Sequence, residues 1–121
     1  MERLARFVMH HRRIVSLVWL LLFVAGALEV VWSFAMKQSA GFSRLGPSGV
    51  TVVAMLASVG LLSWSMRSLP LGTAYTVWTG IGAIGAFLVG VLFFGEAATL
   101  VRLLAAGLIV GGLVLMKVAT P

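Results

Sequence analysis

Four long apolar runs, separated by short polar segments, dominate the pattern of hydrophobic and polar positions along the chain. Each run has about the 20 apolar residues that an α-helix needs to cross the hydrocarbon core of a bilayer. The segments between them are too short to form a separate domain. The sequence therefore predicts an all-α integral membrane fold with one domain, residues 14–118, and four transmembrane helices at about 14–36, 49–68, 73–94 and 99–118.

Composition supports a membrane protein and argues against an enzyme. Of 121 residues, 61% are hydrophobic and 10% are charged, and a soluble domain of this length could not bury so much apolar surface. The chain has no cysteine, which excludes disulfides and cysteine-based metal sites. It also lacks a P-loop, a Ser/His/Asp set and a metal-ligand cluster. We expect no enzymatic activity, no cofactor and no metal.

The basic residues are concentrated in an amino-terminal tail, residues 1–13, and the net charge is +6. Because the tail borders a membrane span, contact with anionic lipid headgroups is a simpler account than nucleic-acid binding. One side of the predicted bundle carries six Lys/Arg and the other three, so the positive-inside rule favours cytoplasmic termini. Without the tail the bias almost disappears. The six are Arg3, Arg6, Arg12, Arg13, Arg67 and Lys117, and the three are Lys37, Arg44 and Arg102.

An alternative interpretation of this start is a secretory signal. A basic segment, an apolar stretch and the small residues 25–27 are typical of a cleavable signal peptide, and cleavage would leave three spans.

Glu29 is the only ionisable residue in the first apolar run, 14–36. A charge at membrane depth costs a few kcal/mol on insertion scales. Apolar sequence continues after Glu29 and its side chain is short, so reaching the interface explains it poorly. We therefore interpret Glu29 as a functional carboxylate that binds a cation or a proton.

Several side chains are placed to complete a site around this carboxylate. Trp32, at i+3 from Glu29, offers an indole N–H that can only donate, and Gly26, at i−3, leaves room for a ligand or a neighbouring helix. Ser58 lies midway along the second span. Tyr75 and Trp78 share a face of the third span, although aromatic residues also form interfacial belts in membrane proteins.

Gly80, Gly82 and Gly85 form a G-x-G-x-x-G pattern in the third span. In a soluble protein this pattern would suggest dinucleotide binding, but that requires a preceding strand and a βαβ unit. Inside a membrane helix the glycines are better explained by close packing or a local bend.

One chain supplies a single membrane carboxylate and four helices, too few to enclose a gated pathway. Two copies would place two Glu29 residues around one cavity, where protons and a cationic substrate compete for the same pair. Such competition is sufficient to exchange the cationic substrate for protons across the membrane.

Three segments, 26–32, 41–45 and 68–82, closely resemble the small multidrug resistance family of bacterial four-helix exporters, and within it the guanidinium exporters. The resemblance covers about residues 18–118. It implies proton-coupled antiport in the inner membrane by an antiparallel, dual-topology homodimer. It also implies a proton- and substrate-binding role for Glu29, and a fourth helix that dimerises through small residues. The implied site-lining and hydrogen-bonding residues are Gly26, Trp32, Ser58, Tyr75 and Trp78, and the implied dimerisation residues are Ala105, Gly111 and Gly112.

The subtype depends mainly on Trp32, because the family's quaternary-ammonium exporters usually have a small residue there. A bulky donating indole narrows the site in favour of a planar ligand such as guanidinium, whose N–H fork matches carboxylate oxygens. The alternatives are a quaternary-ammonium or multidrug exporter of the same fold and a non-transporting membrane interaction subunit. The basic tail is longer than the family usually has.

Overall fold

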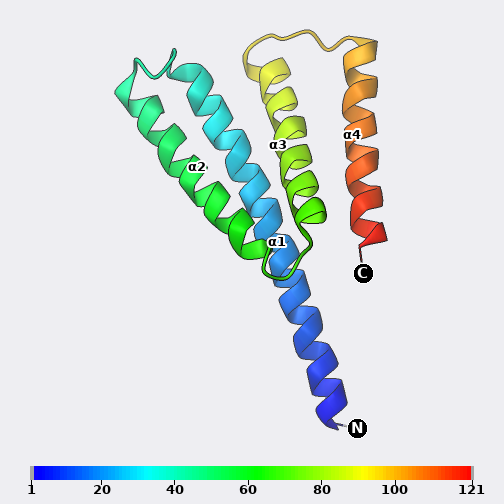
Figure 1. Cartoon of the computed structure of the whole chain (residues 1–121). Helices are drawn as coiled ribbons and strands as arrows, with labels where there is room; N and C mark the ends of the chain where they lie inside the picture. The colour runs from blue at the N-terminus through cyan, green and yellow to red at the C-terminus, as the bar shows by residue number, and fades with distance from the viewer. Residues whose placement is uncertain (1, 121) are drawn as a thin grey trace.

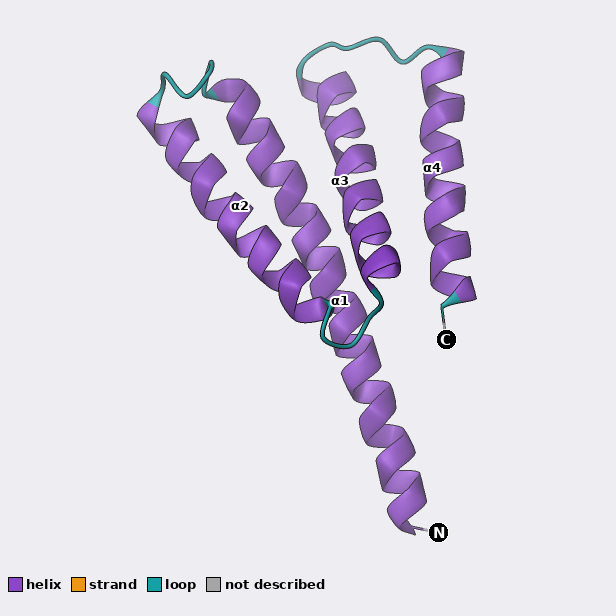
Figure 2. Cartoon of the chain, viewed as in Figure 1, coloured by secondary structure: helices purple, strands orange, loops and turns teal. Residues whose placement is uncertain are grey.

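A computed structural model describes residues 2–120, which form helices joined by loops (Figures 1 and 2). Each of the four helices is long and apolar enough to cross a membrane, so the prediction of an all-helical, multi-pass membrane protein is confirmed. The side chains of residues 7–11 lie outside the described set. The helices are α1 (Glu2–Gln38), α2 (Leu45–Ser65), α3 (Leu71–Phe93) and α4 (Leu100–Ala119).

Helix α1 is much longer than its predicted span, because it continues without a break into the basic tail. Its 37 residues give a length of about 55 Å, against roughly 30 Å for the hydrocarbon core of a bilayer. Neither glycine nor proline occurs between Glu2 and Ala25, so nothing in the sequence ends the helix at the membrane boundary. The amino-terminal part of α1 consequently projects beyond the other three helices (Figure 1).

The start of α2 also differs from the sequence prediction. Gly46 and Pro47 suggest a turn, but both lie in the first turn of α2, which begins at Leu45. Proline is tolerated there because the first backbone N–H groups of a helix have no intrahelical partner. The preceding loop turns sharply through three residues with positive φ, namely Ala40, Gly41 and Phe42.

Helix α1 packs against both α2 and α3, and α3 packs in turn against α4 (Figure 1). The buried apolar core lies where the first three helices meet, toward the α2–α3 loop. It comprises Val18, Leu22, Leu62, Leu69, Ala74 and Val77. This core fixes the relative positions of α1 and α3, between which Glu29 lies.

Helix α4 differs from the others in having no buried residue. Leu113 packs against Gly80 of α3, while large apolar side chains such as Leu104 and Leu108 remain exposed. An added Cβ at Gly111 or Gly112 would meet no atom within 4 Å. Most of the surface of α4 is therefore apolar and uncovered within one chain.

Candidate functional site

The carboxylate of Glu29 lies between α1 and α3, where Gly82 allows the two helices to approach closely. A Cβ built on Gly82 would overlap the Oε2 and Cδ atoms of Glu29 and lie 2.9 Å from its Cγ. Any side chain larger than hydrogen at residue 82 would therefore displace the carboxylate.

Glu29 and Trp32 each present a buried polar atom without a hydrogen-bond partner. These atoms are Oε2 of Glu29, an acceptor, and Nε1 of Trp32, a donor. The hydrogen-bonding role implied for Trp32 would have its indole hold the carboxylate, but no hydrogen bond joins the two side chains among the described residues. Buried polar groups of native proteins are nearly always paired, so both atoms are available to a ligand or to a second subunit.

The remaining glycines of the α3 pattern also mediate close helix packing. A Cβ on Gly85 would overlap the side chain of Val30, and one on Gly26 of α1 would lie 2.6 Å from Cγ2 of Ile81. The room beside Gly26 is thus taken by the neighbouring helix. Helix α3 is continuous from Leu71 to Phe93, so the glycines serve close approach without interrupting the helix.

Ser58 of α2 connects α2 with both α1 and α3. Its hydroxyl is fully buried and donates to the backbone carbonyl of Ala25 at 2.6 Å. The indole N–H of Trp78 donates to the same hydroxyl oxygen at 2.9 Å. Ser58 therefore orients Trp78 and ties α2 to α1 one turn before Glu29.

Tyr75 and Trp78 lie side by side on α3, with ring centroids 5.6 Å apart. Trp78 is half-buried, whereas Tyr75 is 52% exposed. Tyr75 lines a groove of about 480 Å³ between α3 and α4, together with Thr79 and Gly112. The ring of Tyr75 is therefore accessible from outside the chain.

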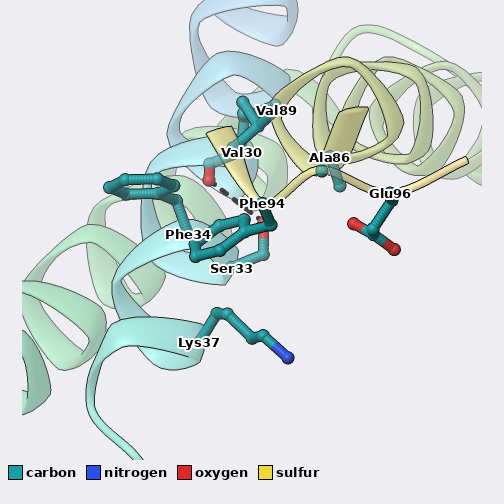
Figure 3. Close-up of a pocket in the computed structure, with 9 residues that line it drawn as sticks. Val30, Ser33, Phe34, Lys37, Ala86, Val89, Phe94 and Glu96 are labelled. Atoms are coloured by element: carbon teal, nitrogen blue, oxygen red, sulfur yellow. Dashed lines mark hydrogen bonds between the residues drawn. The ribbon is translucent and has the colours of Figure 1, made fainter. Parts of the chain in front are cut away.

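A second cleft, which sequence reasoning missed, lies beyond Glu29 toward the α3–α4 loop. Figure 3 shows Ser33, Phe34 and Lys37 of α1 and Glu96 of the loop around a cavity of about 190 Å³. Ser33 donates to the carbonyl of Glu29 at 2.7 Å. Glu96 is exposed, and its side chain contacts Gly90 and pairs with Arg102 at 3.9 Å.

This arrangement can bind a cation and a proton but offers little for covalent chemistry. The described residues contain no group of three or more His, Cys, Asp or Glu side chains that could hold a metal ion. What they provide is one membrane carboxylate, a donating indole beside it and an aromatic wall.

The sequence of residues 17–109 matches the family model described as Small Multidrug Resistance protein, which covers most of the chain. The chain belongs to the small multidrug resistance family. Relatives include proteins named "Guanidinium exporter" from Citrobacter freundii and from Yersinia pseudotuberculosis. The first is 54% identical over 84% of this chain and 97% of its own length, and the second 53% identical over 86% of this chain and 100% of its own length.

Family membership confirms the resemblance identified from the sequence. The relatives are named as exporters and belong to a transporter family, which agrees with the expectation that this protein is not an enzyme. The matched region begins at residue 17, so the basic tail lies outside it.

Proposed function

We propose that the protein is a proton-coupled antiporter that exports guanidinium and small substituted guanidinium cations. The observation that carries this proposal is the pair of buried, unpartnered atoms on Glu29 and Trp32, one an acceptor and the other a donor. They occur in a chain about 54% identical to proteins named guanidinium exporters.

Each part of the site has a role in this proposal. The Glu29 carboxylate accepts the N–H fork of a planar guanidinium in a charge-assisted, bidentate contact. Trp32 narrows the site and supplies a donor for the carboxylate. Trp78, held by Ser58, and Tyr75 form the aromatic wall against which a flat cation can lie.

Exchange follows from competition between protons and the cation for the shared pair of Glu29 carboxylates. A proton neutralises Glu29 and releases the cation, and a cation binds only when the proton has left. A bound proton or a bound cation masks the negative charge of Glu29. The site can therefore switch its opening from one side of the membrane to the other when it is occupied, and this switch is disfavoured when the site is empty.

We further propose that the working unit is an antiparallel, dual-topology homodimer. Helix α4 has no buried residue, and a Cβ added at Gly111 or Gly112 would meet no atom of the same chain within 4 Å, which leaves this helix free to contact a second copy. Ala105, Gly111 and Gly112 would permit close contact between α4 helices. The unpartnered Oε2 atom of Glu29 supports a shared cavity that contains two Glu29 residues.

Residues 14–118 form the transporter domain in this proposal, and residues 1–13 form a tail that favours the cytoplasmic side. The location is the inner membrane of a bacterium, since the relatives that match come from bacteria.

The test is transport by the purified protein in proteoliposomes that report internal pH. A guanidinium gradient should drive proton movement in the opposite direction, and tetraethylammonium should drive much less. Equal proton movement with both cations would favour the quaternary-ammonium alternative, and no movement with either would favour a non-transporting subunit.

A further inference from the structure

The amino-terminal half of α1 carries a shallow, basic groove that lies far from Glu29. Arg12 and Arg13 stand at the beginning of the membrane-spanning part of α1, and both are exposed. Together with Ser16, Leu17 and Leu20 they line a shallow groove on the helix surface. This groove lies where α1 starts to project beyond the other helices (Figure 1).

The side chains that line the groove change from charged to apolar along the helix. Arg13, Ser16, Leu17 and Leu20 are spaced at i, i+3, i+4 and i+7, so they share one face. Guanidinium groups come first, then a hydroxyl, then two leucines that are 48% and 59% exposed. A phospholipid presents matching groups in the same order over a similar length, about 10 Å for seven residues.

Neither Arg12 nor Arg13 has an anionic partner in the described part of the chain. The two salt bridges there join Arg6 to Glu2 and Arg102 to Glu96. The whole chain has only three acidic residues. The third, Glu29, lies within the membrane span, so the counter-ion for this pair of arginines has to come from outside the chain.

We propose that this groove binds one anionic phospholipid, with its phosphate on Arg12 and Arg13 and an acyl chain along Leu17 and Leu20. Guanidinium groups bind phosphate oxygens in a bidentate manner, and the Ser16 hydroxyl adds a donor toward the glycerol region. Two uncompensated positive charges favour a headgroup with net negative charge over a zwitterionic one. The bound lipid fixes the depth of α1 in the bilayer.

The test measures lipid binding to the full-length protein in detergent by native mass spectrometry, with phosphatidylglycerol and phosphatidylcholine as probes. The groove variant is Arg12→Gln with Arg13→Gln, and the matched control is Arg3→Gln with Arg6→Gln, which removes the same charge outside the groove. The groove variant should bind phosphatidylglycerol about 30-fold more weakly, on the scale of two basic side chains at a membrane surface. The control should bind like the wild type, and phosphatidylcholine should bind weakly throughout.

A second variant, Leu17→Ser with Leu20→Ser, tests the acyl chain and should also weaken phosphatidylglycerol binding. Unchanged guanidinium binding in every variant would demonstrate that the fold is intact. Equal losses in the groove variant and its control would overturn the site in favour of diffuse charge attraction. Displacement of the lipid by inorganic phosphate would identify a free anion as the ligand, and unchanged binding in the groove variant would also overturn the proposal.

Discussion

Replacing Gly82 with alanine should weaken guanidinium binding by moving the Glu29 carboxylate. The added Cβ would lie 2.9 Å from Glu29 Cγ and overlap Cδ and Oε2, whereas ordinary contact begins at 3.4 Å. The carboxylate must therefore shift by roughly 1 Å, a displacement large enough to disturb ligand geometry.

The expected magnitude follows from the cost of overpacking a filled site. Inserting one methyl group into well-packed surroundings typically costs about 1–3 kcal/mol. If the helices stay in place and the carboxylate moves, the same free-energy cost is lost from guanidinium binding. The guanidinium Kd should then rise by about 5- to 150-fold. Isothermal titration calorimetry of the purified protein in detergent measures that Kd directly.

Gly60→Ala is the matched control, because it adds the same methyl group to α2, where nothing lies within 4 Å of the new Cβ. This variant should bind guanidinium like the wild type. If Gly82→Ala also bound like the wild type, the close contact between α3 and Glu29 would have no functional importance and the reasoning would be refuted.

Further predictions concern the site and the assembly. Ser58→Ala removes the acceptor of the Trp78 N–H, so the free energy of unfolding in detergent should fall by about 1–3 kcal/mol; an unchanged value would contradict the bridging role. Trp32→Gly should lower guanidinium transport and admit bulkier cations, and continued exclusion of tetraethylammonium with normal guanidinium transport would count against the subtype. Cross-linking in membranes should detect antiparallel pairs, and finding parallel pairs alone would rule out dual topology. Deleting residues 1–13 should bring the two insertion orientations closer to equality, because six basic residues on one side become two.

The sequence was sufficient to predict the number and type of the helices, because apolar run length is set directly by bilayer thickness. It predicted their ends less well. The polarity of residues 2–13 suggests a tail separate from the span, yet helix propensity does not depend on where the membrane ends, and α1 continues through them. Pro47 after Gly46 suggests a turn, although the first turn of a helix accommodates proline equally well.

For the site, sequence spacing placed Glu29 and Trp32 on one face, but it could not reveal contacts between helices. The bridge from Trp78 through Ser58 to Ala25 spans three helices, and it depends on how α2 and α3 pack against α1. The cleft around Ser33 and Glu96 is likewise a product of packing. A buried donor and acceptor left unpaired can be recognised only in three dimensions.

The most direct test of the central claim is the pH dependence of guanidinium binding in the wild type and in Glu29→Gln. The wild type should bind more weakly as pH falls from about 8 to 5, because each added proton neutralises a carboxylate that the cation needs. Glu29→Gln keeps the shape of the side chain but has neither charge nor exchangeable proton, so it should bind no guanidinium and carry no coupled proton flux. Glu96→Gln should behave like the wild type. Guanidinium binding that did not change with pH, or that survived Glu29→Gln, would contradict the account.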